Sequence, residues 1–210
     1  MQLVIHAGMN KTGSTSIQSA LARATQTHFD YLDLATFENP LRGTNHTNFF
    51  FVAFGRPGRL LRRPQFGQMS RKDVRRLRAR LVRTLEAQVR RSAKDRFVLS
   101  AEGFSTPGPI LDHEAAAERL RALSDDIRIV VYVRRPISFV HSEVHQHVRL
   151  CQPLDLERKW PRYRARFEKL EKVFGREAVT YRLYDRKCFP HGDVVTDLCS
   201  TAGLTGAFPA

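Results

Sequence analysis

The chain has few of the features that would place it in a membrane or in an oxidising compartment. Its 210 residues include only three cysteines, Cys151, Cys188 and Cys199, and their spacing fits neither a metal site nor a disulfide framework. No apolar run approaches the ~20 residues that a helix needs to cross a bilayer. Met1 leads straight into a short apolar segment, without the basic stretch of a secretory signal peptide. We therefore expect a cytoplasmic protein with reduced thiols.

Acidic residues are also scarce. The 21 Asp and Glu stand against 35 Lys and Arg, which gives a formal net charge of +14. Most of the excess lies between Arg56 and Arg96, where there are fifteen basic and three acidic residues. Such a patch attracts anions, so nucleic acid, an acidic glycan, a membrane surface and a nucleotide are all candidate partners. Its arginines are not interleaved with aromatic residues and no zinc-finger or RNP signature is present, so we expect no dedicated nucleic-acid site.

The apolar pattern alternates between strand-like and helix-like segments. Residues from about 37 to 68 carry many Gly and Pro and are expected to be irregular. Apolar strands separated by helices predict one α/β domain over residues 1–210, a three-layer sandwich with a mainly parallel central sheet and an irregular basic insertion at about 37–95. The expected strands are 2–6, 96–100, 128–133 and 178–183, and the expected helices are 15–24, 70–91, 113–123, 137–148, 160–174 and 194–202.

A glycine-containing loop with a lysine and several hydroxyl groups follows the first expected strand. Backbone N–H groups at a helix N-terminus lack partners, and the helix dipole favours an anion there. Gly8 and Gly13 let the backbone approach a ligand, and Lys11 adds a positive charge. In the ATP and GTP loop, G-x-x-x-x-G-K-[ST], the lysine follows the second glycine, whereas Lys11 stands two residues before Gly13. The segment predicts a phosphate cradle without the usual place for magnesium.

A second candidate anion site follows the strand at 128–133. This strand ends in Arg134-Arg135-Pro136, and Ser142 comes eight residues after Arg134 on the expected helix. Ligands of parallel sheets bind beyond the carboxyl ends of the strands. We therefore expect the Lys11 loop, Glu102 after its strand and Arg134 to lie at one edge of the sheet.

With these two motifs the chain resembles the sulfotransferases that use 3′-phosphoadenosine 5′-phosphosulfate (PAPS). Their first motif, close to K-[TSA]-G-[TS]-[TS], looks like the segment from Lys11 to Thr15, and their second, R-x-P-x5-S, looks like Arg134, Pro136 and Ser142. The Glu102 strand end is also similar to many bacterial members. The resemblance covers most of the chain and implies a P-loop nucleotide-hydrolase-like sulfotransferase fold, PAPS as co-substrate and no metal.

The resemblance also implies roles for single residues. Lys11 would stabilise the charge that develops on the bridging oxygen as the sulfuryl group leaves. Arg134 and Ser142 would hold the 3′-phosphate of the nucleotide. The residues that would hold the phosphosulfate are Lys11, Thr12, Gly13, Ser14, Thr15 and Ser16.

The acceptor, a hydroxyl or an amine, must lose a proton, so a general base is expected near the sulfur. His46 lies in the irregular region where the acceptor should approach, and Glu102 stands at the active edge; Asp33 is a third choice. The basic patch suggests an anionic acceptor such as an acidic glycan. His141, His145 and His147 do not form an H-E-x-x-H metal motif and are expected to line the acceptor pocket.

Two other functions are considered. An ATP-dependent small-molecule kinase would share the fold, but the position of Lys11 and the lack of a magnesium-binding Asp after a core strand count against it. A non-catalytic protein could use the segment from Arg56 to Arg96 to bind nucleic acid or another anion. The sequence does not predict an oligomeric state.

Overall fold

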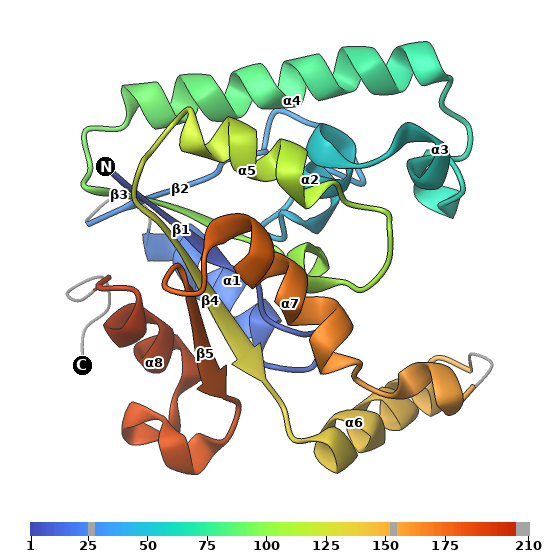
Figure 1. Ribbon diagram of the computed structural model, residues 1–210, viewed down its shortest axis with the longest axis vertical. Coiled ribbons are helices and arrows are strands. Elements are labelled where there is room, and N and C mark those ends of the chain that lie inside the picture. Colours follow the sequence, from blue (N-terminus) through green and yellow to red (C-terminus); the bar gives the residue numbers. More distant parts are fainter. Residues whose placement is uncertain (25–27, 152–154, 205–210) are drawn as a thin grey trace.

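The computed structural model describes residues 1–24, 28–151 and 155–204 and arranges them around a parallel β-sheet (Figure 1). Five strands in this part of the chain pair in the order β2-β3-β1-β4-β5, and each neighbouring pair is parallel. The predicted α/β fold with a parallel central sheet is therefore confirmed. The strands are β1 (Gln2–His6), β2 (Asp30–Tyr31), β3 (Arg96–Ser100), β4 (Ile127–Val133) and β5 (Val179–Leu183).

Strand β1 lies in the middle of the sheet, between two other apolar strands. Its Leu3 pairs with Phe97 of β3 on one side and with Ile127 of β4 on the other. Successive side chains of a strand point to opposite faces of the sheet, and Val4 and Ile5 are both fully buried. Both faces of the sheet must therefore be covered by helices.

Helices cover both faces. On one face, Val4 packs in a cluster with Ile17 of α1 and Leu198 of α8. On the other face, Ile5 belongs to a larger cluster that includes α2, α4, α5 and α7, with α4 running along the outside of α2 and α5 (Figure 1). The helices are α1 (Ser14–Ala24), α2 (Thr47–Phe54), α3 (Pro57–Leu60), α4 (Arg71–Arg91), α5 (His113–Arg121), α6 (Pro136–Arg149), α7 (Tyr163–Phe174) and α8 (Val194–Thr201). The 3₁₀ turns are η1 (Pro64–Phe66), η2 (Glu102–Ser105), η3 (Glu157–Lys159), η4 (Arg186–Cys188) and η5 (Pro190–Gly192).

The prediction that residues 37 to 68 are irregular was wrong for helix α2. The stretch between Gly43 and Gly55 contains no other glycine and no proline, and its apolar residues fill every side of the helix. A helix that is apolar all round is buried rather than amphipathic, so it shows no helical periodicity that could be read from the sequence. All six residues from Phe49 to Phe54 are buried in the core.

Helix α4 forms as the sequence predicts. The hydroxyl of Ser70 accepts a hydrogen bond from the backbone N–H of Asp73 at 3.2 Å, and the Asp73 carboxylate accepts one from the Ser70 N–H at 3.1 Å, which completes a capping box. Arg78 is an inward exception among the basic side chains, because it donates to the carbonyl of Val52 at 3.0 Å. The buried side chains of α4 are Val74, Leu81, Leu85 and Val89, and its exposed basic ones are Arg71, Lys72, Arg75, Arg76, Arg80, Arg83, Arg90 and Arg91.

In the part of the chain that the structure describes, no helix combines the length and the apolar character that a bilayer span requires. The three cysteines are free thiols, with Cys199 buried and Cys151 and Cys188 exposed.

Candidate active site

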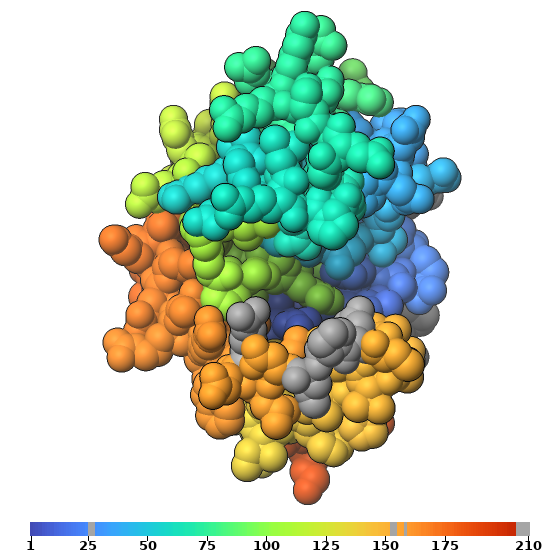
Figure 2. Space-filling view, turned by 90° about the vertical axis from the view of Figure 1, so that its right-hand side faces the viewer, coloured from blue at the N-terminus to red at the C-terminus, as the bar shows by residue number. Residues whose placement is uncertain are grey.

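A cavity of about 640 Å³ opens at the carboxyl edge of the sheet, where β1, β3 and β4 end. Figure 2 shows a hollow on this side of the molecule: its floor is the blue N-terminal segment, with the teal residues around α3 above and the yellow and orange residues of α6 and η3 below. Parallel sheets bind their ligands at this edge. The cavity is lined by Asn10, Lys11, Gly13, Ser14, Thr15, Glu102, Arg134, Ser142, Glu143, Gln146, His147 and Tyr184.

The loop between β1 and α1 is tightly wound. Lys11 and Gly13 have φ angles of 66° and 74°, in the left-handed region. A Cβ at position 13 would also be crowded, because it would lie 3.1 Å from the Val194 side chain and 3.2 Å from that of Tyr184. Glycine at this position therefore brings the backbone close to the cavity that Tyr184 borders.

Hydrogen bonds within the loop fix its shape. The hydroxyl of Thr12 donates to the carbonyl oxygen of Met9 at 2.5 Å. Helix α1 begins directly afterwards, and its first two residues, Ser14 and Thr15, line the cavity. The unpaired N–H groups and the positive end of the helix dipole therefore border the same space as Lys11.

Arg134 ties the second motif to the first. Its Nη1 donates to the backbone carbonyl of Lys11 at 2.9 Å, and its Nε donates to the hydroxyl of Ser138 at 2.8 Å. The guanidinium carbon lies 5.6 Å from the centre of the Tyr184 ring, and the hydroxyl of Tyr163 donates to the Arg134 carbonyl. The side chain is thus oriented between the Lys11 loop and the first turn of α6.

The structure brings most of the predicted phosphate-binding residues together. Lys11, Gly13, Ser14, Thr15, Arg134 and Ser142 all line the cavity. Thr12 is buried, with its hydroxyl turned to Met9, and Ser16 is exposed outside the lining. Only the backbone groups of Thr12 are thus left to contribute to an anion site.

Glu102 lines the same cavity, at the start of η2 directly beyond β3. Burial raises the pKa of Glu102; the Ser14 hydroxyl and the Lys11 ammonium group lower it, and the Glu143 carboxylate raises it. The net direction is upward. A carboxylate with a raised pKa is a stronger base, which suits it to take a proton from a ligand.

His46, the other candidate base, is fully buried and lies outside the cavity lining. Its Nδ1 accepts a hydrogen bond from the backbone N–H of Ser100 at 3.0 Å, and its Nε2 donates to the carbonyl of Leu32 at 2.9 Å. Burial lowers the pKa of His46 to about 3. Both ring nitrogens are therefore engaged in holding the backbone, and the geometry favours Glu102 over His46 as a base.

Asp33 is also remote from the cavity lining. It is exposed, and its carboxylate accepts a hydrogen bond from the backbone N–H of Ala35 at 2.8 Å. This contact stabilises a local turn.

Four lining residues were not predicted: Asn10, Glu143, Gln146 and Tyr184. Asn10 donates from Nδ2 to Oε1 of Glu143 at 2.8 Å, which connects the Lys11 loop to α6. Beside them His147, which was expected to line the pocket, contacts the carbonyl of Glu143 through Nδ1 at 2.9 Å, and Lys159 lies 2.7 Å from its Nε2. Tyr184 supplies the ring beneath Arg134. These groups make up the wall of the cavity that α6 and the end of β5 provide.

Two of these could have been found from the sequence. Tyr184 follows β5 directly, so the rule that ligands meet the carboxyl ends of parallel strands points to it. Gln146 lies four residues after Ser142 on α6, and residues four apart share a helix face. Glu143, by contrast, is one position from Ser142, and its burial depends on contact with Asn10.

The histidines of α6 divide between the two sides of the helix. His147 lines the cavity, as expected, whereas His141 and His145 are exposed with ring centres 4.8 Å apart. Among residues 1–24, 28–151 and 155–204, no group of three or more His, Cys, Asp or Glu side chains is arranged to hold a metal ion.

The cavity thus joins two kinds of chemistry. Lys11, Arg134 and the amino end of α1 offer positive charge and N–H donors, which suit phosphate or sulfate groups. Glu102 offers a basic carboxylate within electrostatic reach of Lys11. Such a site can bind an anionic ligand and accept a proton from a second molecule beside it.

Comparisons with known proteins are consistent with this geometry. No family model and no curated protein sequence matches the chain. Among solved structures, a sulfotransferase from Alicyclobacillus acidocaldarius is 16% identical over 97% of this chain and 81% of its own, with a TM-score of 0.54. The sulfotransferase domain from the curacin biosynthetic pathway is 12% identical over 100% of this chain and 78% of its own, with a TM-score of 0.53. The chain therefore has a sulfotransferase-like α/β fold.

Proposed function

We propose that the protein transfers a sulfuryl group from PAPS to a hydroxyl or an amine of an acceptor. The observation that carries this proposal is the meeting of two motifs at one cavity, where Arg134 donates to the carbonyl of Lys11 at 2.9 Å. Each motif alone would suit many anions. Together they offer two separate phosphate positions, as a nucleotide with a 5′-phosphosulfate and a 3′-phosphate requires.

In the proposed reaction the acceptor oxygen or nitrogen attacks the sulfur in line with the leaving group. A new bond forms between the acceptor and sulfur while the bond from sulfur to the bridging oxygen breaks. The electron pair of that bond stays on the 5′-phosphate, beside Lys11 and the N–H groups of the loop. Lys11 stabilises this charge, and Gly13, Ser14 and Thr15 with the backbone of Thr12 hold the phosphosulfate. Arg134 and Ser142 hold the 3′-phosphate.

The proton of the acceptor goes to Glu102 in this proposal. Glu102 lies in the cavity with a pKa that burial raises, and a base must reach the proton directly or through one water molecule. His46 is a weaker candidate because its two ring nitrogens already bind Ser100 and Leu32. We assign His46 the structural role of holding the loop at 43–47 against β3.

The acceptor is proposed only as a class. The basic residues between Arg56 and Arg96 favour an anionic molecule, for which an acidic glycan is one example. The transfer needs no metal, since Lys11, Arg134 and the helix dipole supply the positive charge.

The proposal is tested by incubating the protein with PAPS labelled in its sulfate and a panel of acceptors that includes acidic and neutral glycans, lipids, peptides and small alcohols. We expect label to move to one acceptor class without added magnesium. Magnesium-dependent transfer of phosphate from ATP to any of these acceptors, with no consumption of PAPS, would contradict the proposal.

A further inference from the structure

The exposed large apolar side chains gather on one part of the molecule. Of seven such residues in the described ranges, five lie between positions 137 and 160. Ile137 is 82% exposed, Val148 67% and Trp160 57%. Contiguous exposed apolar groups on a monomer usually mark a binding surface. The five residues are Ile137, Val148, Leu150, Leu156 and Trp160, and we call them the apolar tip.

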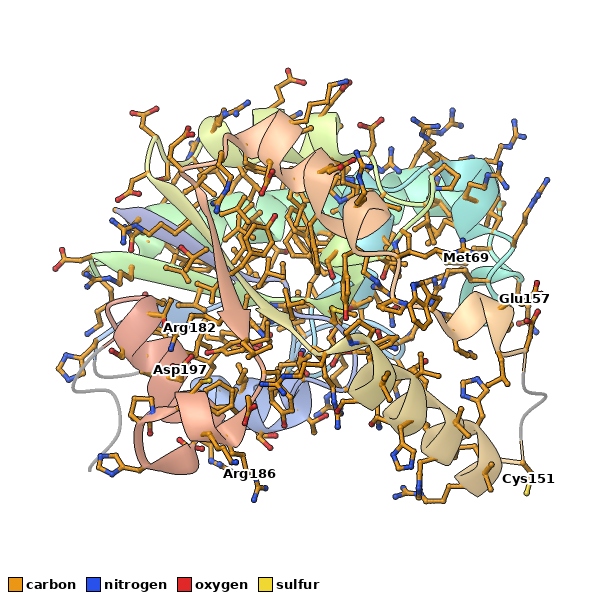
Figure 3. All side chains as sticks on the ribbon, turned by 60° about the horizontal axis from the view of Figure 1, so that its bottom comes forward. Met69, Cys151, Glu157, Arg182, Arg186 and Asp197 are labelled. Carbon is orange, nitrogen blue, oxygen red and sulfur yellow. The ribbon has the colours of Figure 1, made fainter. Side chains whose placement is uncertain are left out.

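Ile137 and Val148 belong to α6, and Leu150, Leu156 and Trp160 stand directly at the ends of α6 and η3. Helix α6 and turn η3 are connected by the contact between His147 and Lys159 at 2.7 Å, and both form the lower border of the hollow in Figure 2. One side of α6 lines the cavity through Ser142 and Glu143. Figure 3 shows Cys151 and Glu157, which bracket the connection between the two elements, at the outer margin of the molecule. A helix turns by about 100° per residue, so Ile137 and Val148 lie on the side of α6 opposite to Ser142 and Glu143. On α6 the apolar tip therefore projects outward, away from the cavity.

Positive charge surrounds the apolar tip. Positions 134 to 166 hold eight Lys and Arg against three Asp and Glu. Within this stretch Arg135, Arg149, Arg162 and Arg164 are exposed. The segment around α3 and the start of α4 is also basic, and its exposed basic residues are Arg56, Arg59, Arg62, Arg71 and Lys72.

We propose that the outer side of α6 and η3 docks on the surface of an anionic lipid bilayer, with the apolar tip inserted among the head groups. Tryptophan and aliphatic side chains flanked by arginines are the composition of elements that lie in a membrane interface. Stable peripheral binding takes two signals, an apolar one and a basic one. Here the apolar tip and the four exposed arginines of the same stretch supply both. The arginines favour an anionic surface over a neutral apolar partner.

Docking in this orientation leaves the cavity uncovered. Ser142 and Glu143, which line it, lie on the side of α6 that faces away from Ile137 and Val148. The docking therefore does not rest on the proposed function.

The chain carries its own reporter for the test, because Trp160 is the only tryptophan. The full-length protein is titrated with vesicles of phosphatidylcholine containing phosphatidylglycerol, and with vesicles of phosphatidylcholine alone. We expect the emission of Trp160 to shift to shorter wavelength with the anionic vesicles, and brominated acyl chains to quench it. Raising the salt from about 0.1 M to about 0.5 M should weaken binding, since it screens the basic groups.

Matched variants separate insertion from plain charge attraction. Val148→Ser combined with Leu156→Ser removes two members of the apolar tip, and we expect the partition coefficient to fall roughly tenfold or more. Leu183→Ser changes an exposed apolar residue outside the tip and should leave the partition coefficient unchanged. Thermal unfolding confirms that each variant is folded.

Several outcomes would overturn the proposal. One is binding to anionic vesicles without any change in Trp160 emission. Another is an equal effect of the tip and control variants on the partition coefficient. A third is a blue shift that depends on protein concentration without lipid, which would indicate a second copy of the chain as the partner. Affinity for 3′-phosphoadenosine 5′-phosphate, measured without lipid, reports separately on the proposed function. A protein that binds this nucleotide but does not bind lipid vesicles would therefore refute the docking alone.

Discussion

Arg134 donates a hydrogen bond from Nη1 to the backbone carbonyl of Lys11, 2.9 Å away, and so joins two segments that are 123 residues apart in the chain. The contact crosses between neighbouring strands, because Lys11 follows β1 and Arg134 follows β4. The hydrogen bond holds the carbonyl of Lys11, whose φ of 66° lies in the left-handed region. A nucleotide that occupies both motifs would span this junction.

Replacing Arg134 with alanine should remove the discrimination between nucleotides with and without a 3′-phosphate. The wild-type protein is expected to bind 3′-phosphoadenosine 5′-phosphate more tightly than adenosine 5′-phosphate, by roughly ten- to a hundredfold, because the guanidinium makes charge-assisted hydrogen bonds. In Arg134→Ala the two affinities should become similar. Calorimetric titration of both nucleotides measures this ratio.

Arg135→Ala is the matched control for this experiment. Arg135 is the next residue, but its exposed side chain pairs with Asp185 at 3.3 Å and does not line the cavity. Its removal should leave the ratio of affinities unchanged. An unchanged ratio in Arg134→Ala would show that the 3′-phosphate does not bind there.

Replacing Lys11 with alanine should abolish most of the transfer while preserving the fold. Losing one donor to the developing charge lowers the turnover rate by roughly 10²- to 10³-fold. The Lys11 side chain is only partly buried, so the free energy of unfolding should change by no more than about 0.5 kcal/mol. Turnover of labelled PAPS and urea unfolding provide the two measurements, and normal turnover in the variant would disprove the assigned role.

Both anion motifs could be predicted from the sequence because their positions follow from topology. Strands β1 and β4 are short apolar runs followed by Lys11 and Arg134, and parallel strands bring their carboxyl ends to one edge. The choice between Glu102 and His46 could not be made in this way. It depends on burial and on the two partners of the His46 ring, which are 14 and 54 residues away in sequence.

Replacing Glu102 with glutamine should lower activity and raise stability. Burial raises the pKa of Glu102, so the folded protein holds this proton more tightly than the unfolded chain does. The unfolded chain releases this proton at a lower pH, and ionisation therefore opposes folding increasingly as the pH rises through the raised value. Glu102→Gln should thus increase the melting temperature more at neutral pH than near pH 4. An equal effect at both pH values would contradict the assigned ionisation.

The pH dependence of transfer provides a second test of Glu102. As the base, it must be ionised, so kcat/KM should fall as the pH decreases through its raised pKa. Glu102→Gln is the control, because glutamine does not ionise. The residual kcat/KM of this variant should not fall on the acidic side of the pH profile, which is the acidic limb. Retention of the limb in the variant would place the base elsewhere.

Three buried histidines should make the protein less stable in mild acid. Burial lowers the pKa of His6 and His113 to about 4 and that of His46 to about 3. The unfolded chain takes up protons near the ordinary value of about 6.5, while the folded protein does not. The free energy of unfolding should therefore fall between pH 7 and pH 5, by about 2 kcal/mol for each histidine.

Urea unfolding at these two pH values measures the effect. His46→Gln should lower stability at neutral pH, because it breaks the contacts to Ser100 and Leu32, but it should reduce the difference between the two pH values. His141 is exposed, so His141→Gln should leave that difference as in the wild type. A protein equally stable at pH 5 and pH 7 would contradict the neutral, buried state of these rings.

Helix α2 and the wall of the cavity show where sequence patterns fail. The run from Phe49 to Phe54 is apolar on all sides, so no period distinguishes a buried helix from other buried structure. Glu143 is a charged residue that the fold buries against Asn10, and only the packing of α6 beside the Lys11 loop reveals it. The capping box of Ser70 and Asp73, by contrast, is a local signal and predicted the start of α4 correctly.

The central claim is that the cavity is built for a nucleotide with a 3′-phosphate, without magnesium. Titration calorimetry of the wild-type protein with 3′-phosphoadenosine 5′-phosphate, and separately with ATP and magnesium, tests this most directly. Tight binding of 3′-phosphoadenosine 5′-phosphate that needs no metal, together with weak binding of ATP, is the predicted result. Preferential binding of ATP with magnesium would contradict the account and favour a kinase.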